Sequence, residues 1–264
     1  MKTNRYREAI AAGRIPVGHM VWEFSTRGIA KILDSVDLDF VLFDMEHSCI
    51  EIERVADLMA WSKAGRFAPM VRVPTGQYHF LARVMDAGAL GVMIPNVETP
   101  EHAKAIVNAV KFAPMGHRGV GLGSAHTDYV APNPHEYFKE INESSVVICQ
   151  IESPTGVANV EAIAATPGVD IVWVGHYDLS QSMGIPGEFD DPRFIDAIQR
   201  VVAAARTHGK RAGIQPGTVK QAEAWMKTGF NVISWGADSA VYRSALLESV
   251  NWVRAAAHRD AQSR

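Results

Sequence analysis

The chain has 264 residues, 47% of them hydrophobic and 21% charged, which suits one α/β barrel with a large core. A formal net charge of -3, without a long run of like charge, argues against nucleic acid or an anionic membrane as partner and favours small molecules. Two cysteines are too few for a disulfide framework, the first residues lack the apolar core of a signal peptide, and no apolar run reaches membrane-spanning length. We therefore expect a soluble, cytoplasmic protein with a single domain over residues 1–264.

Eight apolar runs recur along the chain, and they are typical of buried parallel strands. They lie at residues 17–22, 40–45, 69–73, 91–95, 146–151, 171–175, 211–215 and 231–235. The helices predicted between them from apolar spacing lie at residues 51–63, 77–87, 100–111, 157–165, 192–208 and 219–228. Eight strands that alternate with helices predict an α/β fold of the (β/α)8 TIM-barrel type.

The fourth crossover is the longest connection. Its residues 116–136 are rich in Gly, Pro, His and Asn, a composition that predicts a loop rather than a helix. We expect this segment to be a functional loop over the barrel mouth.

Polar residues gather at the predicted strand ends, where a barrel enzyme places its chemistry. They are Asp44, Glu46 and His47 after the second strand, Arg72 in the third, Gln150 and Glu152 from the fifth, and Asp178 after the sixth. Glu152 and Asp178 would form a site for Mg²⁺ or Mn²⁺, because a hard ion takes oxygen ligands and keeps several waters. The alternative is that each carboxylate caps the helix that follows it.

Two further residues have a setting that suits catalysis. His47 ends an acidic strand, where Asp44, or alternatively Glu46, could orient the imidazole for proton transfer. Arg72 lies inside an apolar strand and needs an anion, which is either a structural carboxylate or a substrate oxyanion. No lysine falls at a predicted strand end, so an imine mechanism is not expected. A phosphate site at Gly236 is a minor alternative.

These residues resemble a known family, the class II pyruvate aldolases of the HpcH/HpaI group, which cleave 4-hydroxy-2-oxo acids to pyruvate or a related 2-oxo acid and an aldehyde. The resemblance covers nearly the whole chain. The matching motifs lie at Phe43–His47, Val71–Val73, Ala113–Gly121, Gln150–Glu152 and Gly175–Gly184.

The resemblance implies a role for each site residue. Glu152 and Asp178 would bind Mg²⁺, Mn²⁺ or Co²⁺, and pyruvate would chelate this ion. The ion and Arg72 would stabilise the enolate. The remaining roles are proton transfer by His47 paired with Asp44, hydrogen bonding by Gln150, and binding of the pyruvate carboxylate by backbone N–H groups near Tyr177 and Asp178. The family also suggests a homohexamer, in which a C-terminal helix at residues 239–258 packs on a neighbouring subunit.

The chain departs from the family pattern in two places. His176 and Tyr177 stand where Pro-Ala is usual, and residues 122–129 lack an arginine often found there. Both changes put the aldehyde acceptor in doubt. The competing hypotheses are a citryl- or malyl-CoA type lyase, a phosphate-handling carboxylase or mutase, and a non-catalytic binding barrel.

Overall fold

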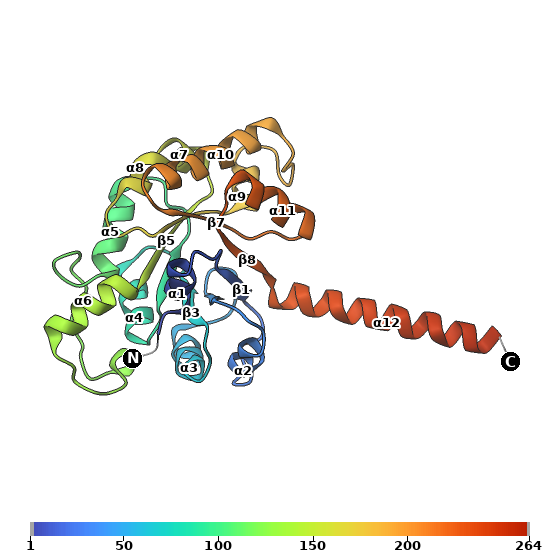
Figure 1. Cartoon of the computed structure of the whole chain (residues 1–264), viewed down its shortest axis with the longest axis horizontal. Coiled ribbons are helices and arrows are strands. Elements are labelled where there is room, and N and C mark those ends of the chain that lie inside the picture. Colours follow the sequence, from blue (N-terminus) through green and yellow to red (C-terminus); the bar gives the residue numbers. More distant parts are fainter. Residues whose placement is uncertain (1–2, 263–264) are drawn as a thin grey trace.

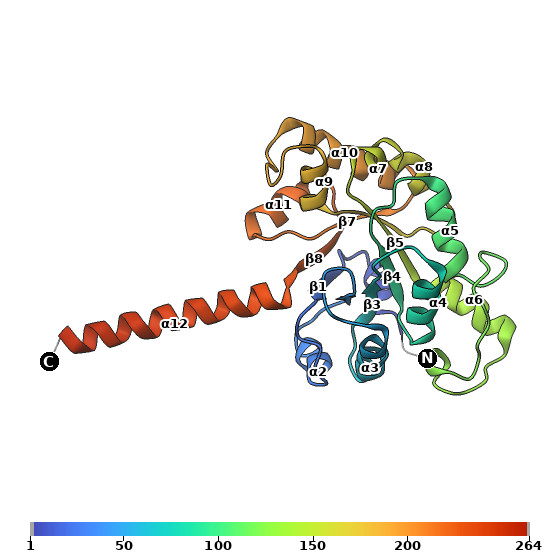
Figure 2. The same ribbon diagram turned by 180° about the vertical axis from the view of Figure 1, so that it is seen from behind.

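The computed structural model describes residues 3–262, and within this range eight parallel strands close into a barrel in chain order. Helices surround the strands (Figures 1 and 2). The strands are β1 (Val17–Val21), β2 (Phe40–Asp44), β3 (Ala68–Arg72), β4 (Gly91–Ile94), β5 (Val146–Ile151), β6 (Ile171–Val174), β7 (Arg211–Ile214) and β8 (Val232–Ala237). Every predicted strand is present with its ends shifted by two residues at most, so the predicted (β/α)8 barrel is confirmed.

The helices also follow the predicted order. They are α1 (Arg5–Ala11), α2 (Ile29–Asp34), α3 (Ile52–Ser62), α4 (Tyr78–Asp86), α5 (Pro100–Val110), α6 (Pro134–Ser144), α7 (Pro154–Ala158), α8 (Val160–Ala165), α9 (His176–Ser182), α10 (Pro192–Thr207), α11 (Val219–Thr228) and α12 (Asp238–Gln262), with a 3-10 turn η1 at Ala125–Thr127. The periodicity did not predict α1, α2, α6 and α9. A capping signal could have revealed α6, because Pro134 follows Asn133, whose side chain accepts the backbone N–H of His135.

Side chains alternate between the two faces of each strand, so one set fills the barrel and the other meets the helices. The inner set is apolar over most of the barrel and includes Phe40, Leu42, Met70 and Ile148. At the end where the strands begin, Tyr6 of α1 packs edge-on against Phe40, with ring centroids 6.1 Å apart. Tyr6 and Phe40 thus close the end of the barrel where the strands begin, and the site lies at the opposite end, where the strands finish.

Trp173 forms the floor of that open end. It is 2% exposed and stands beside Gly213 in the register of β6 and β7. A Cβ atom at residue 213 would overlap the Trp173 ring, so the indole fills the space that a side chain at Gly213 would take. Gln215, two residues further along, lies on the same inward face and therefore above the indole.

The segment 116–136 does not lie over the mouth of its own barrel, and that prediction is wrong. Lys63, directly after α3, donates to the carbonyl of Ala125 and pairs with Asp128. The same part of the segment lines a small cavity with Leu90, the residue directly before β4. It therefore lies near the amino ends of the strands. Composition predicted a loop correctly but gave no information about which end of the barrel it covers.

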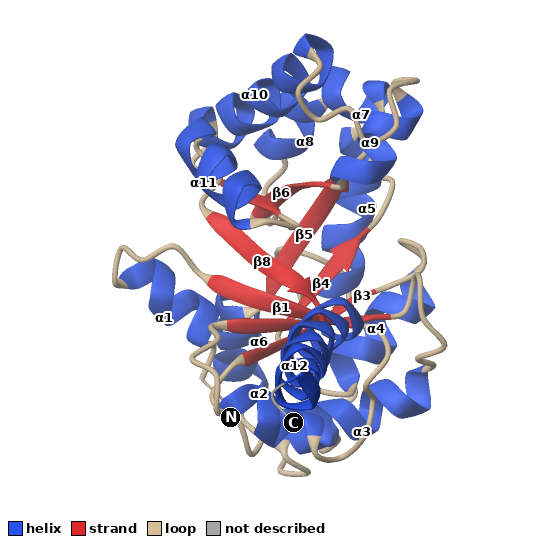
Figure 3. Cartoon of the chain, turned by 90° about the vertical axis from the view of Figure 1, so that its right-hand side faces the viewer, coloured by secondary structure: helices blue, strands red, loops and turns tan. Residues whose placement is uncertain are grey.

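Helix α12 begins one residue before the prediction, runs to Gln262 and extends away from the barrel (Figures 1 and 3). Near its start, Tyr242 packs edge-on against Phe24, with ring centroids 5.5 Å apart. Further along, Leu246, Leu247 and Trp252 are 49%, 50% and 69% exposed. Much of the apolar surface of α12 thus has no cover within the chain. None of the helices described combines the length and apolar character needed to cross a bilayer.

Candidate active site

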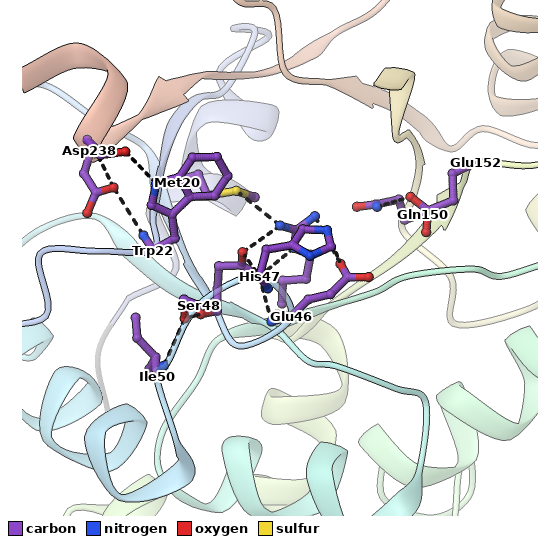
Figure 4. Close-up of polar contacts among 12 residues, drawn as sticks. Met20, Trp22, Glu46, His47, Ser48, Ile50, Gln150, Glu152 and Asp238 are labelled. Carbon is purple, nitrogen blue, oxygen red and sulfur yellow. Dashed lines mark hydrogen bonds and ion pairs between the residues drawn. The ribbon is translucent and has the colours of Figure 1, made fainter. Parts of the chain in front are cut away.

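A cavity of about 380 Å³ opens at the carboxyl ends of the strands, and its wall includes His47, Arg72, Gln150, Tyr177 and Asp178. Glu46 and His47 lie on one side of this opening and Gln150 with Glu152 on the other (Figure 4). The side chains come from the ends of β2, β3 and β5 and from the start of α9. The structure therefore brings the predicted site residues to one mouth, because parallel strands present their carboxyl ends at the same edge.

Arg72 is fixed by carboxylates on two sides. Its Nε and Nη2 each donate to one oxygen of Asp44 at 2.7 Å, and its Nη1 lies 3.2 Å from Oε2 of Glu46. The guanidinium side chain is 8% exposed and the Asp44 carboxylate is fully buried. The structural carboxylate considered from the sequence is thus present twice, as Asp44 and Glu46, and the two parallel bonds to Asp44 hold the guanidinium plane in one orientation.

Asp44 is not the partner of the His47 imidazole, contrary to the sequence prediction. Its two oxygens accept the backbone N–H groups of Glu46 and His47 at 3.0 and 3.3 Å, besides the two bonds from Arg72. The carboxylate nearest the imidazole is Glu46, with 3.7 Å between Nε2 and Oε2. The His47 side chain is 52% exposed and can reach a bound molecule. Asp44 shapes the turn and orients Arg72, while Glu46 faces His47.

Glu152 is held by the backbone and by its own strand. Its Oε1 accepts the N–H of Asn96 at 2.6 Å, and its Oε2 accepts from the amide of Gln150, two residues earlier on the inward face of β5. Asn96 has a positive φ of 53°, a conformation that asparagine tolerates better than most residues. Glu152 does not cap the next helix, because Ser153 accepts the N–H of Gly156 at the start of α7. The capping alternative therefore fails for Glu152.

The site carries an excess of buried negative charge. Burial raises the pKa of Glu46 to about 7 although the charge of Arg72 lowers it, and the charges of Asp44 and Asp178 add to the increase. Burial likewise raises the pKa of Glu152 to about 7, and the charges of Glu46 and Asp178 add to the increase. Three carboxylates thus repel one another across the mouth, and Arg72 is already committed to Asp44 and Glu46.

The donor set fits a hard divalent ion. Within residues 3–262, neither Glu152 nor Asp178 forms an ion pair, and Oε2 of Glu46 is buried without a hydrogen bond. A cation between these carboxylates would relieve the repulsion. Within the described range, no group of three or more His, Cys, Asp or Glu side chains could hold a metal ion together, so a metal site would rest on two carboxylates, Glu152 and Asp178. Two carboxylates with free space beside them match Mg²⁺ or Mn²⁺, which keep coordination positions for water and substrate.

His176 and Tyr177 form part of an aromatic cluster at the start of α9. The His176 ring lies 4.6 Å from Tyr177, 5.1 Å from Phe189 and 5.1 Å from Trp225, measured between ring centroids. Burial lowers the pKa of His176 to about 4. Its neighbours are rings, so His176 and Tyr177 pack as an aromatic pair within this cluster. Tyr177 is 65% exposed at the rim of the cavity.

The carboxylate of Asp238, at the start of α12, takes up backbone N–H donors that a phosphate would need. It accepts N–H groups from Glu23 and Phe24 at 3.0 and 2.7 Å, and from Ser239 at 2.8 Å. An acidic side chain that already fills these donors repels a second anion. The structure therefore gives no support to the phosphate alternative near Gly236.

Sequence reasoning missed part of the cavity wall. Met20, Trp22, Trp173 and Gln215 line it together with the predicted residues. Strand alternation could have found them, because Met20 and Trp22 share one face of β1 and its extension, and Gln215 follows the last inward position of β7. Charge could not reveal them, because none of these four side chains is ionised.

Comparison with known proteins agrees with this geometry. A model of the family described as HpcH/HpaI aldolase/citrate lyase matches residues 20–245. The chain belongs to this family. A Citrobacter koseri protein named 5-keto-4-deoxy-D-glucarate aldolase is 34% identical over 243 residues, which are 92% of this chain and 93% of that protein. The predicted family, and with it an enzyme of the aldolase class, is confirmed.

Two crystal structures of the HpcH/HpaI family share the fold over nearly the whole chain. The HpcH/HpaI aldolase from Desulfitobacterium hafniense is 29% identical with a TM-score of 0.88, covering 94% of this chain and 96% of that one. The aldolase/citrate lyase family protein from Burkholderia cenocepacia is 31% identical with a TM-score of 0.88, covering 96% and 100%. This HpcH/HpaI chain therefore keeps the barrel of its relatives from end to end.

Proposed function

We propose that this enzyme reversibly cleaves 4-hydroxy-2-oxo acids to pyruvate, or a related 2-oxo acid, and an aldehyde. The observation that carries the proposal is a pair of interacting carboxylates, Glu152 and Asp178, which have no cationic partner among the described residues, beside a guanidinium held in one orientation by Asp44. The pair would hold Mg²⁺, Mn²⁺ or Co²⁺. When bound, such an ion supplies Lewis-acid stabilisation of the charge that develops on the 2-oxo oxygen.

The protein groups have distinct roles in this proposal. In cleavage the 4-hydroxyl loses a proton, the C3–C4 bond breaks to leave the aldehyde, and the electron pair passes to the 2-oxo acid as its enolate, which takes a proton at C3. Arg72 faces the cavity and stabilises the enolate oxygen. His47 moves the proton, with Glu46 as its neighbour. Gln150 positions Glu152, and the backbone at Tyr177 and Asp178 binds the substrate carboxylate.

The CoA-lyase alternative has weaker support. A CoA thioester needs cationic groups for its phosphates. Among the described residues of the cavity wall, Arg72 is the one arginine and there is no lysine. The buried Lys111 lies elsewhere, where its Nζ donates to the carbonyls of Asn142 and Ser145. A non-catalytic role is also disfavoured, because the site carries buried charge that serves no packing purpose.

Metal removal tests the proposed function. We expect a chelator to abolish both the cleavage of 4-hydroxy-2-oxo acids and deuterium exchange into pyruvate, because the wall offers no lysine for an imine. Adding Mg²⁺, Mn²⁺ or Co²⁺ should restore both rates, and their order would identify the preferred ion. The measurements are pyruvate release by a coupled assay and exchange by proton NMR. Trapping of a covalent pyruvate adduct by borohydride would refute the mechanism.

We also propose that α12 packs on a neighbouring copy in a homohexamer. The support is the exposed apolar surface of Leu246, Leu247 and Trp252 on a helix that leaves its own barrel. Replacing Leu246 and Leu247 together by Glu should therefore shift the protein to smaller species in analytical ultracentrifugation. Lys139→Glu, at an exposed position on α6, is the control and should leave the assembly intact. An unchanged sedimentation coefficient in the double variant would contradict this role of α12.

A further inference from the structure

The cavity at the mouth has two unlike halves. Arg72, Gln150 and Asp178 supply the polar half, where the proposed function places the metal and the 2-oxo acid. The rest of the wall comes from β1, β6, β7 and β8, and its side chains include Met20, Trp22, Trp173 and Ala237. Since the polar half holds the 2-oxo acid, the second substrate must approach its C3 from this other half.

Trp22 gives that half a fixed apolar surface. Its indole N–H donates to Oγ of Ser239 at 2.7 Å, so the ring has no free donor to offer a ligand. The backbone beside it is held as well, because Asp238 accepts the N–H groups of Glu23 and Phe24. Residues at the start of α12 therefore hold both the ring and the chain that carries it. Figure 4 shows the contact of Asp238 with the backbone of Trp22.

Among its described residues, the same half has no arginine or lysine that could pair with an anion. Within the described residues that line the cavity, Arg72 is the one arginine and no lysine is present. Arg72 is already paired with Asp44 and Glu46. A carboxylate carried on the far end of the aldehyde would be buried against Trp22 and Trp173 without a partner, which is costly.

Gln215 is the polar side chain on this apolar wall. It lies at the end of β7, above Trp173, and its Oε1 is buried without a hydrogen bond to any described residue. The uncharged amide of Gln215 can lie beside a neutral ligand, but it cannot neutralise the negative charge of a carboxylate. Because of this position, a charged residue in place of Gln215 would change which aldehydes can enter the cavity.

We infer that the acceptor half binds an uncharged aldehyde with an apolar body, and that Trp22 and Gln215 set this preference. The inference rests on the proposed aldolase function, since it names the second substrate of that same site. It selects against aldehydes that carry a second carboxylate.

The test uses the metal-loaded full-length enzyme, pyruvate, and two aldehydes of similar length. Pentanal is uncharged, and succinic semialdehyde carries a terminal carboxylate. The value of kcat/KM is measured for each aldehyde in carbon–carbon bond formation, and the ratio of the two values is the readout. Each protein's deuterium exchange into pyruvate is measured in parallel, because that reaction needs no aldehyde and reports the proposed function alone.

For the parent enzyme we expect a preference for pentanal of about tenfold or more, because a buried, unpaired carboxylate is penalised strongly. Gln215→Arg should move the ratio toward succinic semialdehyde by about tenfold or more, since the guanidinium can pair with the carboxylate. Trp22→Ala should lower kcat/KM for pentanal more than for succinic semialdehyde. Gln199→Arg, at an exposed position on α10, is the matched control and should keep the parental ratio.

The outcomes separate the two proposals. In one outcome the parent enzyme exchanges deuterium into pyruvate and yet uses succinic semialdehyde as well as pentanal or better. This result overturns the inference and leaves the proposed aldolase function standing. A ratio that Gln215→Arg and Trp22→Ala both leave unchanged also overturns it, because the aldehyde then binds elsewhere. Absence of metal-dependent exchange in the parent enzyme overturns the proposed function and the inference with it.

Discussion

Glu152→Gln and Asp178→Asn are each expected to lower metal-dependent deuterium exchange into pyruvate by about two to three orders of magnitude. Both changes remove the negative charge of a proposed metal ligand and keep the side-chain volume. In Glu152→Gln the amide oxygen can still accept the N–H of Asn96, so the turn after β4 should survive. The loss is therefore expected in metal affinity rather than in folding.

Calorimetric titration with Mn²⁺ measures that affinity, and circular dichroism reports the fold. Asp57→Asn is a matched control, because Asp57 is an exposed residue on α3 that pairs with Arg54. It should bind Mn²⁺ as the parent protein does. Unaltered Mn²⁺ affinity in either site variant would show that its carboxylate is not a metal ligand.

Arg72→Lys is expected to lower kcat by about two orders of magnitude with a smaller change in KM. A lysine keeps the positive charge but cannot make two parallel bonds to Asp44 and a third contact with Glu46. The charge at the enolate oxygen would then lose an oriented donor. Because the charge matters most in the transition state, the effect should fall on kcat.

A second measurement separates catalysis from stability. Asp44 is fully buried and relies on Arg72, so the melting temperature of Arg72→Lys should fall as well. Deuterium exchange into pyruvate, expressed per folded molecule, isolates the catalytic part. Arg83→Lys, at an exposed position on α4, controls for the substitution itself. Exchange at the parental rate in Arg72→Lys would mean that Arg72 holds the barrel together and does not act on the enolate.

The sequence alone determined the strands and the inward polar residues at their ends. Both follow from local physics, because a buried parallel strand needs a continuous apolar run and side chains alternate with a period of two. Arg72 inside such a run and Glu152 at the end of another therefore had to face one mouth once the strands were parallel. The expected position of Gln150 follows from the same rule, whereas Asp178 reaches the mouth from the start of α9, after β6.

The partners of these side chains were decided by the tertiary structure. Asp44 is adjacent in sequence to the His47 turn, yet its carboxylate bonds Arg72, which stands beside it in the register of β2 and β3. Closeness in the sequence favoured Asp44, which is the wrong partner for the His47 imidazole. The choice depends on strand register, which brings residues 28 positions apart into contact.

The course of residues 116–136 and the apolar half of the mouth also required the tertiary structure. A glycine-rich composition predicts irregular backbone but not the direction in which it leaves the helix before it, and here Lys63 and Asp128 hold it near the amino ends of the strands. Trp22 follows β1, whereas Trp173 lies in β6 and Gln215 follows β7, and these strands enclose one cavity only when β8 pairs with β1 and closes the barrel. Local patterns fix which way each side chain points, whereas closure of the barrel fixes which side chains meet.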